Sequence, residues 1–332
     1  MVIHVRPYVG AADLQRVLDL KRACTTPENM YDAPTLSELR VLLAPLAQDP
    51  AAERPLWEDE QGRVIGHLYR RAMTQQATMI WEEADGALVA YALMAPPSTA
   101  LTFQVHPQAR GSGLETKILT WALERLRAET GWRGRTFSLW CRCHDSETER
   151  RSILEREGFI PLPARDLRLV RLLDVSLPVS HLPEGFVLRR GVHGEELEPY
   201  QELHRAVFDG ISMGLDYHQS PAYEPDLDVI ALDSAGTFAA FCLCELTGVS
   251  DSRGEYSVGE IGVIGTRPTY QRRELGRVLL LRGIHRLKER GATSVFLETE
   301  QAETPALHLF TSLGFRRVST WQWMTKEIAP LT

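Results

Sequence analysis

The sequence predicts an α/β (α+β) protein made of two similar domains, and two observations support this fold class. Stretches with a helical period are interspersed with short runs rich in Val, Ile and Leu along the 332 residues, which is the pattern of helices packed on a sheet. The second half of the chain also repeats the first in the same order. A repeat unit this long indicates a duplicated domain and excludes a solenoid of short repeats.

Four pairs of segments carry the repeat, and only the loops between them differ in length. The pairs are Val5–Ala23 with Leu188–Ala206, Ala84–Leu93 with Ser234–Leu243, Gln104–Gly113 with Gly265–Glu274, and Gly158-Phe159 with Gly314-Phe315. Each half therefore contains a strand, one or more helices, a run of strands, a long helix, a strand, a helix and a last strand. The linker falls at Asp174–Glu184, which holds two prolines and no clear period. We expect an N-terminal domain at 1–175 and a C-terminal domain at 183–332.

Composition limits the class of protein. With 44% hydrophobic and 24% charged residues, the chain is typical of soluble globular proteins. A net charge of −7 disfavours a general nucleic-acid partner. No apolar run is long enough for a membrane-spanning helix, and the start lacks the order of a signal peptide. We expect a cytoplasmic protein with no membrane partner.

The five cysteines do not have the spacing of a metal site. Cys141/Cys143 and Cys242/Cys244 lie two residues apart on expected strands, so the members of each pair point to the same face. A structural zinc site would need Cys-x-x-Cys-like pairs that come together in the fold. We therefore expect core thiols and no metal.

The stretch from Gly259 to Gly291 is the most informative part of the chain. It predicts a strand over Glu260–Thr266, a break at Pro268, a basic turn and then a long helix that ends at Gly291. The turn holds Gln271, two arginines and Gly276. Free N–H groups and the helix dipole both favour an anion at such a helix N-terminus.

These residues resemble the GNAT superfamily of acyl-CoA-dependent N-acyltransferases. Gln271-x-x-Glu274-x-Gly276 is similar to the superfamily's pyrophosphate loop, Gln/Arg-x-x-Gly-x-Gly/Ala, with a glutamate at its first glycine. The run Ala306–Phe315 resembles the closing helix and its Gly-Phe turn. Tyr223–Leu232 and Gly259-Glu260 resemble tandem members of the mycothiol-synthase type. The resemblance implies two tandem domains, each with a mixed, mainly antiparallel, splayed sheet flanked by helices.

The resemblance also implies a cosubstrate, acetyl-CoA or another acyl-CoA, held by the C-terminal domain. The strand would pair with the pantetheine arm, the loop would bind the pyrophosphate, and the closing helix would approach the cofactor. The implied cofactor-binding residues are Ile264, Gly265, Thr266, Gln271, Arg272, Arg273, Glu274, Leu275, Gly276, Arg277 and Phe310. The three arginines suit charge-assisted bonds to phosphate, or else remain solvated surface charges.

The resemblance implies Glu260 as the candidate catalytic residue, a general base, because many members of the superfamily have a carboxylate at this place on the central strand. Strand alternation predicts that 260, 262 and 264 share a face, and a carboxylate there could take the proton of an ammonium. The alternative is a strand-edge glutamate that faces solvent. The usual general acid of the superfamily is a tyrosine where this chain has Phe310, which cannot protonate a thiolate.

The first half keeps the framework without these groups. Its loop is Arg110-x-x-Gly113-x-Glu115, and Thr99 and Leu154 stand where the second half has Glu260 and Phe310. We expect the N-terminal domain to be degenerate, either structural or binding CoA without chemistry.

The sequence therefore predicts an N-acetyltransferase that moves an acetyl or acyl group from CoA directly to a primary amine of a small molecule. One alternative is a catalytically inactive acyl-CoA-binding pseudoenzyme or scaffold, which Phe310, Glu274 and Glu115 favour. A second is a partner-binding protein that kept only the fold. The expected partner is a small-molecule amine, and the chain is a monomer or a homodimer.

Overall fold

The chain folds into two compact units. The structure, a computed structural model, describes residues 3–26, 29, 39, 43, 78–94, 99–128, 136–192, 194–208, 223–251 and 254–329. Unit 1 contains the described residues up to 166 together with 250–251 and 319–329, and unit 2 contains the described residues of 167–249 and 254–318. Within these described ranges, no helix is long and apolar enough to cross a bilayer.

Both halves of the sequence have the same order of elements, which confirms the predicted repeat. The first half contains β1 (Ile3–Pro7), α1 (Gly10–Cys24), β2 (Met79–Glu83), β3 (Leu88–Met94), β4 (Ala100–Val105), α4 (Leu114–Ala128), β5 (Phe137–His144), α5 (Thr148–Arg156) and β6 (Ile160–Leu172). The second contains β7 (Phe186–Arg190), α6 (Leu197–Val207), β8 (Asp228–Asp233), β9 (Phe238–Asp251), β10 (Gly254–Thr266), α8 (Leu275–Glu289), β11 (Ser294–Glu300), α9 (Thr304–Ser312) and β12 (Arg316–Ile328). A short 3-10 turn precedes α4 at Pro107–Ala109 and α8 at Pro268–Tyr270.

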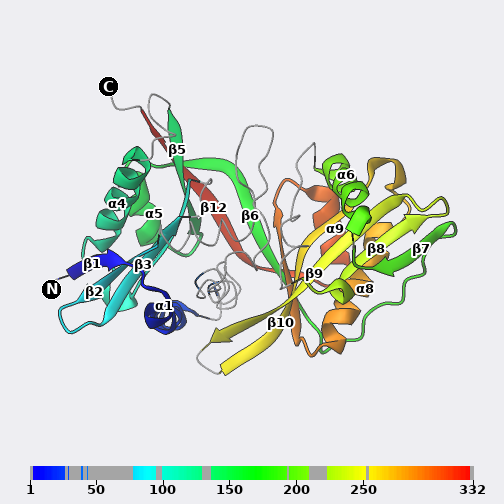
Figure 1. Ribbon diagram of the computed structural model, residues 1–332, viewed down its shortest axis with the longest axis horizontal. Helices are drawn as coiled ribbons and strands as arrows, with labels where there is room; N and C mark the ends of the chain where they lie inside the picture. Colours follow the sequence, from blue (N-terminus) through cyan, green and yellow to red (C-terminus); the bar gives the residue numbers. More distant parts are fainter. Residues whose placement is uncertain are drawn as a thin grey trace. The chain divides into compact units, whose positions relative to one another are not determined.

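Unit 1 is built on a sheet in the order β1-β2-β3-β4-β5-β12. Its neighbouring strands are antiparallel except for β4 and β5, which are parallel. The last strand comes from the other half of the sequence: β12 pairs with β5 from Trp321 opposite His144 to Ile328 opposite Phe137, and runs beside it in Figure 1.

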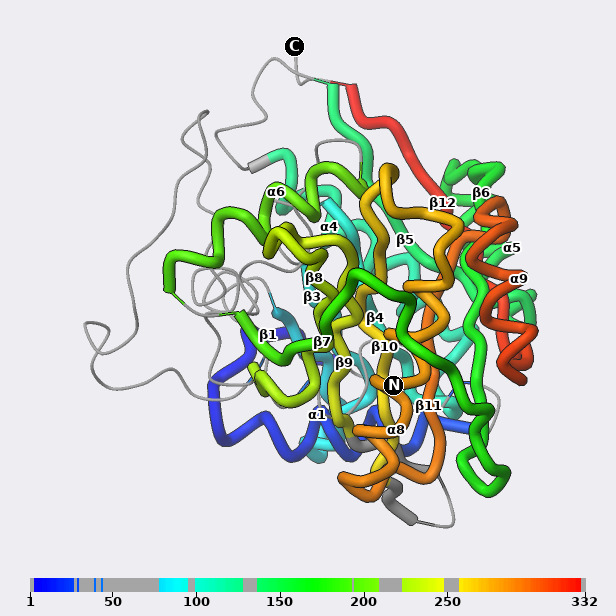
Figure 2. Tube along the Cα trace, turned by 90° about the vertical axis from the view of Figure 1, so that its right-hand side faces the viewer, coloured from blue at the N-terminus to red at the C-terminus, as the bar shows by residue number. Residues whose placement is uncertain are grey.

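Unit 2 has the matching sheet, in the order β6-β11-β10-β9-β8-β7, and Figure 2 shows β7, β8, β9, β10 and β11 side by side. Here the strand next to β11 is β6, whose residues from Leu167 on belong to unit 2 although they come from the first half of the sequence. Its second part joins β11, where Leu173 N–H donates to Thr293 O at 3.0 Å and Arg168 binds Glu298 at 2.9 Å. The two halves have thus exchanged their last strands.

Helices cover both faces of each sheet (Figure 1). In unit 2, α8 packs a buried stripe that includes Leu279 against Cys242 on one face. On the other face, α6 packs Tyr200 and Leu203 against Phe241. Unit 1 repeats this arrangement with α4 and α1. The prediction of a mixed, mainly antiparallel sheet flanked by helices is confirmed.

The five cysteines are free thiols inside the protein, as predicted. Burial raises the pKa of Cys141 to about 12, so this thiol stays protonated and unreactive. Cys242 and Cys244 face α8, with their sulfur atoms 3.7 Å apart. Among the described residues, no group of three or more His, Cys, Asp or Glu side chains could hold a metal ion.

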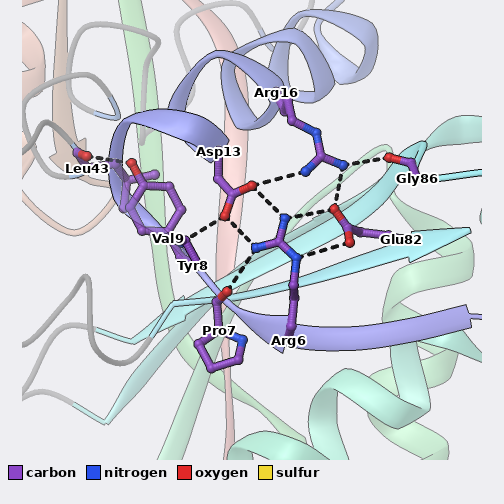
Figure 3. A network of polar contacts seen from close by, with 9 residues as sticks. All are labelled: Arg6, Pro7, Tyr8, Val9, Asp13, Arg16, Leu43, Glu82 and Gly86. Atoms are coloured by element: carbon purple, nitrogen blue, oxygen red, sulfur yellow. Dashed lines mark hydrogen bonds and ion pairs between the residues drawn. The ribbon is translucent and has the colours of Figure 1, made fainter.

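A network of ion pairs joins β1, α1 and β2 in unit 1 (Figure 3). Asp13 is 1% exposed and accepts hydrogen bonds from the Arg6 guanidinium at 2.6 and 2.7 Å. Arg6 and Arg16 both also bind Glu82. Hydrogen bonding from Arg6 lowers the pKa of Asp13 below its usual value. A carboxylate this deeply buried depends on its cationic partners.

We expect Asp13→Asn to lower the free energy of unfolding by about 3 kcal/mol at pH 7, because it leaves Arg6 without its buried counter-charge. The pKa of Asp13 is lower in the folded state than in the unfolded chain. Its contribution is therefore complete above the unfolded pKa, about 4, and is lost as the pH falls through the folded pKa. Urea unfolding of both proteins between pH 7 and pH 3 should show the difference shrinking only below about pH 4.

The matched control is Asp19→Asn on the same helix. The Asp19 side chain is 60% exposed and pairs with Arg22 at the surface, so its loss should cost less than about 0.5 kcal/mol. Equal effects of the two substitutions at pH 7 would contradict a special role for the buried network.

Candidate active site

The turn between β10 and α8 contains two residues in the left-handed backbone region. Arg272 has φ 62° and Glu274 has φ 59°, and neither is a glycine. The matching residues of the first half, Gly111 and Gly113, have φ 70° and 82°. The left-handed conformation costs a non-glycine residue about 1 kcal/mol. Unit 2 therefore keeps the backbone of a glycine loop without the glycines.

This backbone has features that favour an anion. Left-handed residues in a turn, here Arg272 and Glu274, can direct successive N–H groups toward one concave side. The first N–H groups of α8 have no partner within the helix, and its dipole adds positive potential. Glu274, the N-cap of α8, makes no side-chain capping bond. The amides at the start of α8 are thus not capped by that carboxylate.

Three of the predicted cofactor residues lie where this turn meets β10. Gln271 Nε2 donates to Thr266 O at 3.3 Å, which ties the turn to the end of the strand. Leu275 is 1% exposed and anchors α8 in the core. A Cβ on Gly276 would lie 3.6 Å from Leu309 and 3.8 Å from Thr266 Oγ1, which is ordinary contact. Gly276 is therefore not needed for packing in the free protein.

The three arginines of the turn differ in their surroundings. Arg272 is exposed. Arg273 lies with its guanidinium over the ring of Tyr270, 5.6 Å from the ring centre. Arg277, in the first turn of α8, donates to Ser312 Oγ at 3.1 Å. All three stand at the turn, and Arg273 and Arg277 already have protein contacts.

The strands β10 and β11 separate at the level of this turn. They pair in parallel from Val258 opposite Ser294 to Ile261 opposite Leu297. Their register ends there, although β10 continues to Thr266. Within the described strands, the backbone of β10 beyond Ile261 therefore does not pair with β11. It can offer its N–H and C=O groups to an extended ligand instead.

An extra residue interrupts β10 just where the separation begins. Ile261 and Ile264 both pack in the core under α8. Val263 packs in the core under α6, and a Cβ on Gly265 would point at Val207 and Phe241 on that side. Regular alternation would put Ile261 and Val263 on one face. The alternation is therefore interrupted at residues 262–263, as by a β-bulge, and the side chains that follow point to the other face.

The prediction that residues 260, 262 and 264 share a face is wrong for Ile264, which packs under α8. Gly262 lies beside Glu245 on the same face as Glu260. Glu260 is half-buried, lies opposite Phe296 in the parallel register and shares the α6 face with Val263 and Gly265. It occupies the paired part of β10 directly before the bulge.

The first half has no such bulge in the described part of β4. Leu101, Phe103 and Val105 all pack in one core, at every second residue. Thr99 matches Glu260, and its hydroxyl donates to Ser138 O. Unit 1 therefore has neither the carboxylate nor the interrupted alternation, although β4 beyond Leu101 likewise does not pair with β5 within the described strands.

The closing helix does not bring its aromatic residue to the candidate site. Phe310 is 3% exposed, and its ring packs edge-on against Phe315 in the core of unit 2. In the free protein the ring therefore has a packing role, and its expected cofactor contact stays a prediction. His308 is exposed, and Leu154, which matches Phe310 in the first half, is also fully buried.

Two charged groups near the candidate site were not predicted. A carboxylate oxygen of Glu245 on β9 lies 3.6 Å from where a Cβ on Gly262 would stand. Arg168 on β6 is 2% exposed, binds Glu298 and lies over the Phe296 ring at 4.9 Å. Strand alternation along β9 could have placed Glu245 on the α6 face. No local signal could place Arg168, because its strand comes from the other half of the sequence.

Comparison with known proteins agrees with this geometry. Residues 195–315 match the model of the acetyltransferase (GNAT) family. A mycothiol acetyltransferase of Thermobispora bispora is 32% identical over 231 residues, which cover 67% of this chain and 73% of the relative. One of Propionibacterium freudenreichii is 26% identical over 328 residues, which cover 94% and 88%.

Solved structures match over nearly the whole chain. A GCN5-related N-acetyltransferase from Sphaerobacter thermophilus has a TM-score of 0.69 at 22% identity, and covers 99% of this chain and 97% of its own. A tandem GNAT protein from the clavulanic acid biosynthesis pathway has a TM-score of 0.66 at 14% identity, with complete coverage of both chains. Such low identities support the fold alone, whereas the sequence relatives support the family. The chain belongs to the GNAT family and is an acetyltransferase of that type.

Proposed function

We propose that unit 2 transfers an acetyl group from acetyl-CoA directly to a primary amine of a small molecule, with Glu260 as the general base. The observation that carries the proposal is the position of Glu260. It lies on the α6 face of β10, immediately before the bulge and the separation from β11. An extended thioester held along β10 would present its carbonyl carbon close to this carboxylate.

Binding of the cosubstrate divides into two parts. The strand backbone at Ile264, Gly265 and Thr266 would pair with the pantetheine arm. The turn from Gln271 to Arg277 would bind the pyrophosphate through backbone N–H groups and the arginines. The support is the geometry of the left-handed turn and of the unpaired strand segment. Phe310 is not included in this site, because its ring is enclosed in the core.

The proposed reaction is a single displacement through a tetrahedral intermediate. Glu260 accepts a proton from the ammonium of the acceptor, directly or through water, and the free amine nitrogen attacks the thioester carbon. A backbone N–H freed by the bulge donates to the oxyanion, a contact typically worth about 3 kcal/mol in the transition state. The C–S bond then breaks. Water supplies the proton to the thiolate, because α9 has Phe310 in place of a tyrosine that could donate one.

The names of the relatives support a choice of acceptors to test. Several are named mycothiol acetyltransferase, so mycothiol-related amines stand first among the candidate acceptors. A net charge of −7 adds a mild preference for cationic small molecules. Amino acids, polyamines and aminoglycosides complete the panel that should be screened with acetyl-CoA.

The decisive test is Glu260→Gln. We expect it to lower kcat about 100- to 10,000-fold with the best acceptor of the panel, the range typical of a lost general base. The dissociation constant of acetyl-CoA should stay unchanged, because the variant leaves the anion turn intact. Release of the free thiol of CoA measures turnover, and calorimetric titration measures binding.

Glu289→Gln is the matched control. Its side chain is 63% exposed near the end of α8, far along the helix from the turn, and it pairs only with Arg286 among the described side chains. It should leave both constants unchanged. Wild-type turnover by Glu260→Gln would exclude Glu260 as the base.

A further inference from the structure

Unit 1 contains a turn with the same backbone as the anion turn of unit 2. The turn follows β4 and a 3-10 turn, has Gly111 and Gly113 in the left-handed region and leads into the 15-residue helix α4. Aligned on the repeat, Gly111 matches Arg272, Gly113 matches Glu274 and Glu115 matches Gly276. The helix N-terminus and the concave row of N–H groups are therefore both present.

A carboxylate of the protein itself lies in this turn. Glu115 is 5% exposed, and its Oε1 accepts a hydrogen bond from Gly111 N–H at 3.4 Å. Its Oε2 is buried and has no hydrogen-bond partner within the described structure. A desolvated carboxylate oxygen is costly unless something offsets it. Here the carboxylate lies at the N-terminus of α4, whose dipole attracts an anion, beside the Gly111 amide.

A second carboxylate lies close to the same turn. Glu149, in the first turn of α5, places its Oε1 2.9 Å from where a Cβ on Gly111 would stand. Arg110 is the nearest cation in the turn, and its Nε donates to Val105 O at 3.4 Å. An incoming diphosphate would meet these two carboxylates in the turn, and the repulsion between the negative charges would strongly disfavour its binding.

We propose that Glu115 is an internal ligand of an otherwise intact pyrophosphate site, and that unit 1 binds no acyl-CoA while Glu115 is in place. The carboxylate takes the position that a phosphate group of a nucleotide diphosphate takes in such a turn. The main feature that separates the two turns is then the residue at this position, glutamate in unit 1 and glycine in unit 2, and Glu149 adds a second carboxylate in unit 1. This inference concerns binding alone and does not depend on the acceptor or on Glu260.

The test transfers the cofactor from one unit to the other. The parent variant is Gly276→Glu, which gives unit 2 the residue of unit 1. Calorimetric titration with CoA should find one equivalent bound by the wild type and none by this parent. Adding Glu115→Ala and Glu149→Gln to the parent should restore one equivalent, at least about 100-fold tighter than the parent, as expected for regaining two bonds to a charged ligand.

Controls keep the result interpretable. Glu115→Ala preserves helix propensity where glycine would weaken α4, and thermal melting reports whether each variant is folded. Glu149→Gln alone in the parent should restore no binding, because Glu115 still fills the turn. Two equivalents bound by the wild type would overturn the proposal. So would a folded triple variant that binds neither CoA nor inorganic pyrophosphate.

Discussion

Gly276→Glu is expected to lower the affinity of the chain for acetyl-CoA by at least about 100-fold while the protein stays folded. Folding should tolerate the change because a Cβ at this position makes only ordinary contacts with Leu309 and Thr266. The new carboxylate would stand where Glu115 stands in unit 1 and could accept the N–H of Arg272 in the same way. The pyrophosphate would then compete with a tethered anion for the same amides.

Glu274→Gly is the matched substitution in the same turn, with the opposite expected sign. It removes a carboxylate that lies beside the proposed pyrophosphate site. It also removes the cost, about 1 kcal/mol, of holding a non-glycine residue in the left-handed region. Affinity for acetyl-CoA should rise about tenfold, and the thermal midpoint should rise as well. If both substitutions left the affinity unchanged, the turn between β10 and α8 would not be the cofactor site.

Features set by neighbouring residues could be predicted from the sequence. The strand, the break at Pro268 and the helix up to Gly291 follow from local rules, and the structure has β10, the 3-10 turn, α8 and a left-handed Gly291 there. The repeat extended this prediction to the first half. The order of the elements and the layered fold could therefore be predicted from the sequence.

The orientation of the residues that follow Glu260 could not be predicted, because it depends on one extra residue. A bulge at 262–263 changes which face every following side chain points to, and a run such as Gly-Glu-Ile-Gly-Val-Ile-Gly carries apolar residues on both faces in either phase. The burial of Phe310 also could not be predicted, because it depends on tertiary packing. Its position in the alignment matches a catalytic tyrosine, whereas its surroundings are set by the packing of α9 on Phe315.

The exchange of β6 and β12 has no signal in the sequence at all. Each strand follows its own helix and Gly-Phe turn, so local rules assign each to its own half. Which sheet a strand joins is decided by long-range pairing, as between β12 and β5. This exchange makes the extent of an independently folding unit a question for experiment.

A fragment of residues 183–332, the C-terminal domain expected from the sequence, should fail to fold. It lacks β6, whose Leu167, Leu169 and Leu173 are 3%, 1% and 4% exposed in the core of unit 2. Each buried leucine is worth about 2–5 kcal/mol. Their joint loss matches or exceeds the 5–15 kcal/mol that typically stabilises a domain. The fragment also keeps β12 without its partner β5, which exposes Met324 and Ile328.

A fragment of residues 160–318 is the matched comparison, because it has a similar length, includes β6 and omits most of β12. It should be soluble and monomeric, unfold cooperatively on heating and give a dispersed amide spectrum, whereas 183–332 should aggregate or give a collapsed one. Cooperative unfolding of 183–332 would show that the exchanged strand is dispensable. If 160–318 also binds one equivalent of acetyl-CoA, the first half of the sequence contributes to cofactor binding mainly by supplying one strand and the Arg168–Glu298 pair that comes with it.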